Sequence, residues 1–192
     1  MVARWEKLRA ELVADYRVLR VCGDRSRSPR TGAAHDFIVL EMADWVNVVP
    51  ITAAGRVVMI RQYRHGTRNV GLEIPGGVAE GDDASLAQAA ARELEEETGY
   101  VAADMIELGR IAPNPAIQDN YCHSFLALGA ERTRAQDLDP GEDIAVEEVA
   151  LEGVAALIQT GEIHHSLVVV AFYWLEQYRR VHPERFNFSS YK

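Results

Sequence analysis

The chain has 192 residues, 48% of them hydrophobic, and carries a formal net charge of −9 at pH 7. Such a chain can bury one sizeable core, and its acidic balance, with no basic run, argues against a nucleic-acid partner. The two cysteines, Cys22 and Cys122, give no disulfide framework and favour a reducing, cytoplasmic setting. No apolar segment follows the charged N-terminal residues, and the apolar run from Leu167 to Leu175 is too short to span a bilayer. We therefore expect neither a signal peptide nor a membrane partner.

The first 44 residues are expected to form a helix followed by a β-hairpin. Residues 2–13 fit a short amphipathic helix with its apolar residues on one side. Residues 16–22 alternate as a strand, residues 23–34 are polar and turn-forming, and residues 35–42 fit the returning strand.

The remainder of the chain mixes strand and helix patterns. Residues 45–52 and 56–61 are predicted strands joined by a short turn, and residues 154–160 and 166–180 are predicted helices. This alternation predicts an α/β fold.

A further helix between Ser85 and Gly99 has explicit start and stop signals. Ser85 is a favourable N-cap, Gln88 three residues later completes a capping box, and Gly99 stands where a glycine ends a helix. The stripe expected to face a core consists of Leu86, Ala89, Ala90 and Leu94.

Acidic residues interrupt that stripe. At about 100° per residue, Glu93 and Glu97 project along the apolar stripe, Glu96 lies beside them, and Glu95 points to the far side. Carboxylates are seldom buried unless they are paired or bind a metal. A solvated acidic face is therefore the better interpretation for Glu95 alone.

The three remaining carboxylates form a compact set of hard oxygen ligands. No cysteine or histidine accompanies them, which favours Mg²⁺ or Mn²⁺ over zinc. Gly76 and Gly77, ahead of the helix, allow a tight turn and a close backbone approach to an ion or a phosphate. The chemistry indicated is metal-assisted attack of water on a phosphoanhydride.

These residues resemble a known family. Arg92 to Tyr100 (RELEEETGY) resembles the core of the Nudix box, REUxEExGU, and residues 73–77 (EIPGG) resemble the segment that precedes it in the ADP-ribose and nucleotide-sugar branch. The first half of the box departs from the pattern. The family has five residues between the glycine and a glutamate, and seven between that glutamate and the arginine. Here five residues separate Gly77 from Asp83, an aspartate, and eight separate Asp83 from Arg92.

The resemblance implies substrate contacts before the box. The RQYR segment from Arg61 to Arg64 matches a segment of the branch and implies arginines near the pyrophosphate, where forked guanidinium donors suit phosphate oxygens. The alternative for both arginines is an ion pair at the end of a strand. Of the two, Arg64 is the stronger candidate.

Three further residues are candidates for substrate binding. Trp45 is either a base-stacking residue or an ordinary core tryptophan. Glu73 begins the EIPGG segment. Pro115, sixteen residues after Gly99, resembles the proline that marks ADP-ribose pyrophosphatases, although an Asn-Pro pair also fits a simple turn.

An acidic loop over residues 136–143 precedes a predicted strand at residues 144–151. In the branch, one acidic residue of this loop reaches the metals and another is the catalytic base. Glu142 best matches the metal-contacting glutamate, and Pro140 replaces the glutamate expected two residues earlier. The base is therefore Glu142, Asp139 or a glutamate of the box.

The resemblance covers nearly the whole chain. It implies a Nudix α/β/α sandwich with a mixed sheet over residues 45–192 and a dimerising helix and hairpin over residues 1–44, which makes a homodimer the expected assembly. Catalytic roles fall to Glu97 and Glu142, with Arg92 orienting the glutamates by ion pairing. The expected ligands of Mg²⁺ or Mn²⁺ are the Gly76 carbonyl, Glu93, Glu96, Glu97 and Glu142.

The function that follows is hydrolysis of ADP-ribose, or of another nucleoside diphosphate sugar, to a nucleoside monophosphate and a sugar phosphate. Two alternatives stay open. One is a Nudix hydrolase of NADH, a dinucleoside polyphosphate or a damaged nucleoside triphosphate. The other is a non-catalytic, Nudix-like ligand-binding module.

Overall fold

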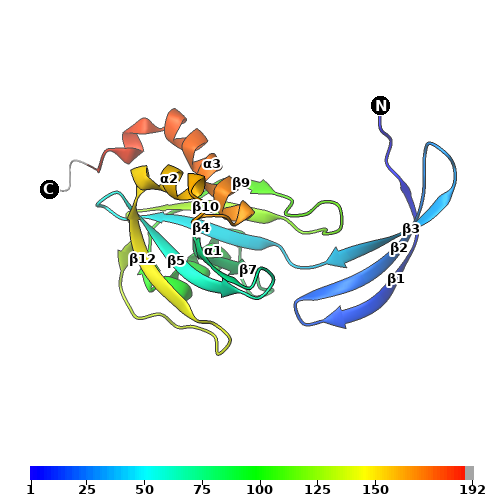
Figure 1. The fold of residues 1–192 in the computed structure, drawn as a ribbon, viewed down its shortest axis with the longest axis horizontal. Coiled ribbons are helices and arrows are strands. Elements are labelled where there is room, and N and C mark those ends of the chain that lie inside the picture. Colours follow the sequence, from blue (N-terminus) through cyan, green and yellow to red (C-terminus); the bar gives the residue numbers. More distant parts are fainter. Residues whose placement is uncertain (189–192) are drawn as a thin grey trace. The chain divides into compact units, whose positions relative to one another are not determined.

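The computed structural model describes residues 1–188 (Figure 1). Residues 189–192, the end of the expected 45–192 domain, lie outside the described residues. The chain divides into two compact units, Met1–Asp44 with Ala112–Tyr121, and Trp45–Ile111 with Cys122–Lys192. Residues 112–121 therefore group with the N-terminal residues, and the expected division into domains 1–44 and 45–192 stays a prediction. No helix within residues 1–188 is long and apolar enough to cross a membrane.

The first unit contains a three-stranded antiparallel sheet in the order β1-β2-β3. Its strands are β1 (Glu6–Tyr16), β2 (Leu19–Arg27) and β3 (Ala34–Glu41). Residues 112–121 join this unit through backbone contacts, since the Leu40 N–H donates to the Ile117 carbonyl at 2.7 Å.

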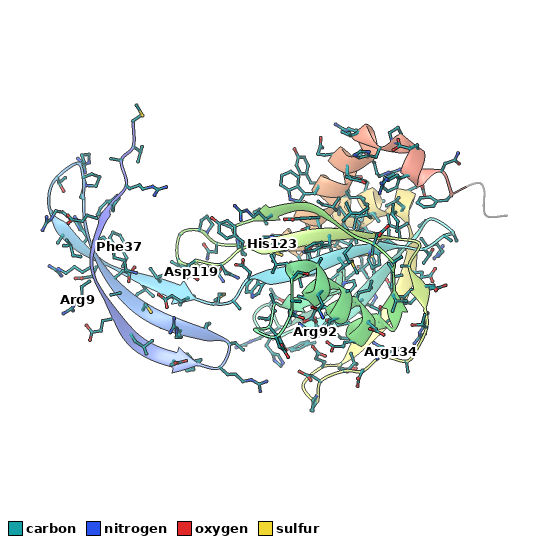
Figure 2. The ribbon with its side chains drawn as sticks, turned by 180° about the vertical axis from the view of Figure 1, so that it is seen from behind. Arg9, Phe37, Arg92, Asp119, His123 and Arg134 are labelled. Carbon is teal, nitrogen blue, oxygen red and sulfur yellow. The ribbon has the colours of Figure 1, made fainter. Side chains whose placement is uncertain are left out.

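The helix expected over residues 2–13 is wrong, because most of that segment is strand β1. The spacing of Leu8 and Leu12 fits the two-residue repeat of a strand as well as a helical repeat. A helix of that length is marginal in water, whereas β1 gains backbone pairing with β2 along most of its length. The Trp5 ring also packs edge-on against the Phe37 ring of β3, with centroids 5.4 Å apart; Phe37 is labelled in Figure 2.

The second unit is built on a mixed sheet in the order β12-β5-β4-β10-β9. These strands are β4 (Trp45–Ile51), β5 (Arg56–Arg64), β9 (Met105–Ile111), β10 (Cys122–Leu128) and β12 (Ile144–Ala150). The pairing of β4 with β10 is parallel, and the other pairings are antiparallel. Two short strands, β8 (Tyr100–Val101) and β11 (Glu131–Arg132), form a separate ribbon.

The two central strands separate, and this separation creates the setting of the site. β4 and β5 share one paired position, Ile51 with Val57. Beyond that point, β6 (Asn69–Glu73) pairs with β5 and β7 (Gly76–Val78) pairs with β4. The EIPGG segment therefore lies within the sheet and is not an appended loop.

Helices cover both faces of this sheet, as expected for an α/β/α sandwich (Figure 1). The helices are α1 (Leu86–Thr98) on one face, and α2 (Val154–Gln159) and α3 (Ser166–Val181) on the other; 3₁₀ turns are η1 (Leu151–Gly153) and η2 (Pro183–Phe186). Because successive strand residues face opposite sides, Val58 packs in the α1 core while Val57 and Met59 pack in the α3 core. The predicted strands at 45–52 and 56–61 and the predicted helices at 154–160 and 166–180 are confirmed.

The ends of α1 are those that the sequence predicts. The Ser85 hydroxyl accepts from the Gln88 N–H at 3.2 Å, and Gly99 ends the helix at a φ of 74°. The Gln88 side chain accepts from the Ala84 N–H at 2.7 Å, one residue earlier than in an ideal capping box.

Replacing the N-cap is expected to weaken the fold by a known amount. Ser85→Ala removes the acceptor for one helix N–H and lowers the free energy of unfolding by about 1 kcal/mol, measured by urea denaturation. Ser85→Asp keeps an acceptor and is expected to retain most of the stability. Equal losses in both variants would show that the cap contributes little.

Candidate active site

The four glutamates of α1 have different environments. Glu97 is 2% exposed, and the side chain of Glu93 is 12% exposed. Those of Glu95 and Glu96 are 37% and 36% exposed. Glu95 points away from the other three glutamates and forms an ion pair at 3.1 Å with Arg134, which is labelled in Figure 2. Helix geometry therefore placed Glu93 and Glu97 correctly, while Glu96 is more exposed than its neighbours on the stripe.

The two glycines of β7 lie directly against the buried carboxylates. The Gly76 N–H donates to Oε2 of Glu97 at 2.8 Å. A Cβ on Gly76 would overlap the carbonyl oxygen of Val46, and a Cβ on Gly77 would lie 2.5 Å from the carboxylate of Glu93. Glycine is required at position 76, where the backbone of β4 leaves no room for a side chain, and a side chain at position 77 would displace the carboxylate of Glu93.

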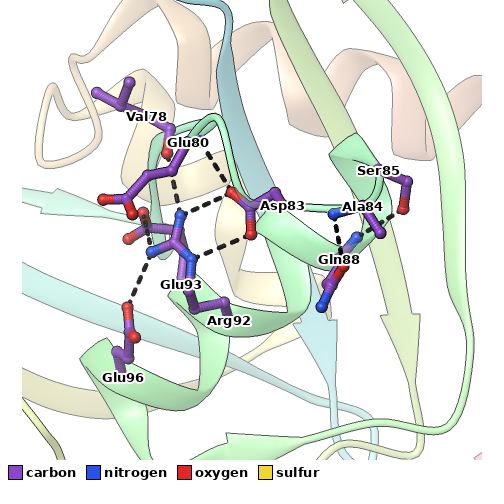
Figure 3. A network of polar contacts seen from close by, with 9 residues as sticks. All are labelled: Val78, Glu80, Asp83, Ala84, Ser85, Gln88, Arg92, Glu93 and Glu96. Atoms are coloured by element: carbon purple, nitrogen blue, oxygen red, sulfur yellow. Dashed lines mark hydrogen bonds and ion pairs between the residues drawn. The ribbon is translucent and has the colours of Figure 1, made fainter.

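Arg92 is the centre of a polar network (Figure 3). Its Nη1 donates to Glu93 at 2.9 Å and to Glu96 at 3.0 Å. Its Nε and Nη2 donate to the two oxygens of Asp83 at 3.3 and 3.1 Å, and Nη2 also donates to the Val78 carbonyl at 3.1 Å. One guanidinium thus fixes two carboxylates of α1 against the turn that precedes the helix.

The shifted Asp83 still reaches Arg92 despite the extra residue in the box. Its side chain is 7% exposed and accepts from the Glu80 N–H at 2.8 Å. The hydrogen bonds from Arg92 lower the pKa of Asp83 below its ordinary 3.8. The inserted residue is therefore absorbed in the turn, and the ion pair to Arg92 is retained.

Acidic side chains are concentrated around Glu93 and Glu97. The pKa of Glu97 is raised to about 8, chiefly by burial and also by the nearby Glu93 and Glu142 carboxylates, while the Gly76 N–H and Arg64 oppose the rise. Burial also raises the pKa of Glu93 to about 7, although Arg92 opposes the rise. Glu142 comes from a distant loop, so the fold brings together the residues that the sequence assigned to the metal.

Glu142 lies at the end of a tight turn. The Glu142 N–H donates to the Asp139 carbonyl at 2.9 Å, and the Asp139 N–H donates back to the Glu142 carboxylate at 3.1 Å. Pro140 and Gly141 occupy the central positions, where proline and glycine favour a turn. Asp139 is exposed, whereas Glu142 is half-buried.

The two arginines of β5 face opposite sides of the sheet. Arg64 donates to Glu73 through Nε at 3.0 Å and Nη2 at 2.8 Å, on the side of α1. Glu73 is 3% exposed. Arg61 lies on the α3 side, where it pairs with Glu147 at 3.0 Å and Glu162 at 2.7 Å. Of the two, Arg64 is the one that acts on the pKa of Glu97.

The two remaining candidates for substrate binding, Trp45 and Pro115, have different environments. Trp45 is half-buried at the start of β4 and is not part of the buried core. Pro115 is exposed and follows Asn114, whose carbonyl accepts from the N–H groups of Ile117 and Gln118. It belongs to the compact unit of the N-terminal sheet. Substrate contacts by both residues stay predictions.

His165 lies close enough to Glu73 and Arg64 for their charges to act on it, although the sequence does not predict this. It caps α3, where its Nδ1 accepts from the Leu167 N–H at 3.2 Å. Burial lowers the pKa of His165, and the charges of Glu73 and Arg64 act on it in opposite directions. No local sequence pattern predicts this position, because only the tertiary fold brings the start of α3 close to β5 and β6.

The donor set fits a hard divalent cation. Carboxylates with raised pKa values and a backbone held close by glycines are typical of oxygen-rich Mg²⁺ or Mn²⁺ sites. Within residues 1–188, no three His, Cys, Asp or Glu side chains already surround a common point as ligands.

An acidic helix held against a double-glycine strand inside an α/β/α sandwich defines a hydrolase of the phosphoanhydride class. Residues 43–170 match the NUDIX domain, and the chain belongs to the Nudix family.

Several known proteins are similar to this chain. It is 32% identical over 133 residues to the ADP-ribose pyrophosphatase of Bacillus subtilis (strain 168), a match that covers 68% of this chain and 71% of that protein. It is 30% identical over 171 residues to the methanol dehydrogenase activator of Bacillus methanolicus, covering 88% and 91%. The crystal structure of an ADP compounds hydrolase superposes with a TM-score of 0.82 at 21% identity, covering 95% and 97%. The resemblance to the ADP-ribose pyrophosphatase branch, and the fold expected from it, are confirmed.

The Asp83–Arg92 pair is expected to make stability depend on pH in acid. Because the pKa of Asp83 is lower in the folded protein than its ordinary 3.8, the pair stabilises fully above about pH 4 and less as the pH falls through the lowered value. Asp83→Asn should therefore lower the free energy of unfolding by about 1 kcal/mol at pH 6, and by less below pH 4.

Urea denaturation between pH 6 and pH 3 measures this difference. Asp82→Asn, a change at the exposed neighbour, is the matched control and should leave the profile unchanged. A gap between Asp83→Asn and the parent that stays constant with pH would contradict the assignment.

Proposed function

We propose that this protein is a metal-dependent Nudix hydrolase that cleaves the pyrophosphate of ADP-ribose or another nucleoside diphosphate sugar. The products would be a nucleoside monophosphate and a sugar phosphate. The observation that carries the proposal is the pair of buried carboxylates, Glu93 and Glu97, held against the Gly76–Gly77 backbone. The similarity to an ADP-ribose pyrophosphatase makes ADP-ribose the first substrate to test.

Several residues of the chain would bind the metal, and one would hold these ligands in position. Glu93, Glu97 and Glu142 supply carboxylates, helped by Glu96 and the Gly76 carbonyl. Bound Mg²⁺ or Mn²⁺ would neutralise the pyrophosphate and lower the pKa of an attacking water. Arg92 holds Glu93 and Glu96 in place through its two hydrogen bonds.

Other residues would take the proton and hold the substrate. Glu142 is the proposed base, because it is half-buried beside Glu93 and Glu97 while Asp139 is exposed. Arg64 is the proposed pyrophosphate contact, since it lies on the face of the sheet that bears α1. Trp45 is the proposed platform for the base.

Glu97→Gln is expected to reduce turnover by at least about 100-fold while the fold stays intact, because it removes a negative ligand without changing shape. The measurement is phosphate-coupled turnover with Mg²⁺ against ADP-ribose, other nucleotide sugars, NADH, diadenosine polyphosphates and nucleoside triphosphates. Glu95→Gln, on the far side of the same helix, is the matched control and should keep near-native turnover.

The same panel separates the competing functions. Near-native turnover by Glu97→Gln would overturn the metal assignment. Faster cleavage of triphosphates or dinucleotides would keep the box chemistry and change the substrate. Tight binding of ADP-ribose without hydrolysis at saturating Mg²⁺, seen by calorimetry, would favour a non-catalytic module.

A second candidate function follows from a relative that covers 88% of the chain and is named a methanol dehydrogenase activator. On that ground we propose activation of a methanol dehydrogenase as an alternative role. Alcohol oxidation by a methanol dehydrogenase, followed with and without this protein, tests it. If a stimulation were equal for the parent and Glu97→Gln, the effect would come from binding and not from hydrolysis.

A homodimer built on the N-terminal sheet is also proposed. β1 is an edge strand whose residues are almost all exposed, and edge strands with unpaired backbone groups are ready to pair with another chain. The large apolar side chains exposed between residues 5 and 38 are Trp5, Leu8, Leu12, Val13, Tyr16, Val18, Phe37 and Ile38. Such an accumulation is typical of a surface that another chain covers.

Leu12→Glu is expected to convert the dimer to a monomer, because it places a charge in that apolar surface; sedimentation velocity measures the change. Tyr173→Glu makes the same kind of change at an exposed residue of α3 and should leave the dimer intact. A parent protein that sediments as a monomer would refute the proposal.

The cytoplasmic location expected from the two cysteines stays a prediction.

A further inference from the structure

The segment Thr133–Asp137 wraps the C-terminal end of α1. The last four carbonyls of a helix have no partner within it. Here the Asp137 N–H donates to the Glu96 carbonyl at 2.9 Å, and the side-chain Nε2 of Gln136 donates to the Glu97 carbonyl at 2.6 Å. The Thr133 N–H donates to the Gly99 carbonyl just beyond the helix, also at 2.9 Å. The end of the helix that carries Glu97 is thus held by one short piece of chain.

Gln136 makes a second hydrogen bond, to an element other than α1. Its Nε2 also donates to the carbonyl of Ile144 at 3.0 Å, at the first residue of β12. A side-chain amide nitrogen has two hydrogens, so one group can serve both carbonyls. Gln136 therefore links the backbone of Glu97 to the start of β12.

This link also closes the loop that carries Glu142. Residues 137–143 leave Gln136 and return to Ile144, so one side chain ties both ends of the loop together. Within the loop, the contacts of Glu142 are with Asp139 of the same turn. Those local bonds shape the turn but do not fix its distance from α1. The carboxylate of Glu142 also faces those of Glu93 and Glu97, and like charges favour separation.

We propose that Gln136 is a positioning residue that sets Glu142 against Glu93 and Glu97. It acts through the two carbonyls and touches neither metal nor substrate. The inference rests on the proposed function, in which Glu142 is a metal ligand or base, and it assigns the residue that holds that carboxylate in place.

Gln136→Met tests the link, because methionine keeps the length of the side chain and removes both donors. Arg134→Met is the matched control: Arg134 lies on the same segment and also contacts α1, but through Glu95 on the far side of the helix. Hydrogen exchange of the Asp139 amide and of the amides of residues 141–144 is expected to become about tenfold faster in Gln136→Met and to stay unchanged in Arg134→Met. Unchanged exchange in Gln136→Met would overturn the proposal.

Turnover and metal binding test whether Gln136 acts through Glu142. Gln136→Met should lower kcat, or weaken Mn²⁺ binding in a calorimetric titration, by about tenfold, with the KM for ADP-ribose little changed. In a Glu142→Gln background, the same substitution should have less than about a twofold further effect, since coupled residues are not additive. A full, multiplicative loss in that background would show a general structural role and refute the proposal.

The two hypotheses fail in different ways. If the parent protein hydrolyses none of the substrates, the proposed function fails, while exchange and Mn²⁺ titration still judge the link. If the parent hydrolyses ADP-ribose and Gln136→Met matches it in kcat, exchange and Mn²⁺ affinity, the link alone is refuted.

Discussion

The Gly76 N–H donates to the Glu97 carboxylate from a strand position that has no room for a side chain. An acidic side chain that is 2% exposed needs such a donor, because burial without compensation would favour its neutral form. The close fit depends on the separation of β4 from β5, which admits β6 and β7 into the middle of the sheet. The C-terminal half of α1 is tied to the sheet at this contact, where position 76 admits only glycine.

Charge is distributed unevenly around that contact. Arg92 neutralises part of the acidic cluster, since it binds Asp83, Glu93 and Glu96 at once. Glu97 receives only a backbone donor and the more distant field of Arg64, while Glu142 adds charge from the other side. The acidic side chains on the side of the cluster away from Arg92 therefore have fewer positive groups near them than those that Arg92 contacts. Such an arrangement favours the binding of a cation.

The sequence predicted the features that depend on local rules. Both ends of α1 follow from Ser85 and Gly99, and the contrast between buried Glu97 and exposed Glu95 follows from helical periodicity. The N-terminal strand was wrongly predicted as a helix, because its spacing satisfies both repeats and only pairing with β2 decides between them. Neither the position of His165 near Arg64 and Glu73 nor the two hydrogen bonds of the Gln136 side chain could be predicted. Both arise where segments distant in sequence meet.

The separated strands also bear on how the molecule folds. The site takes its parts from β4, the β6–β7 segment, α1 and the loop before β12, and β4 pairs in parallel with the distant β10. Loop-closure entropy makes such non-local pairing slow. α1 can form early from its own caps, yet its carboxylates gain their glycine backing only when the sheet closes. The buried carboxylates of α1 therefore acquire their final surroundings only after segments far apart in the chain have paired.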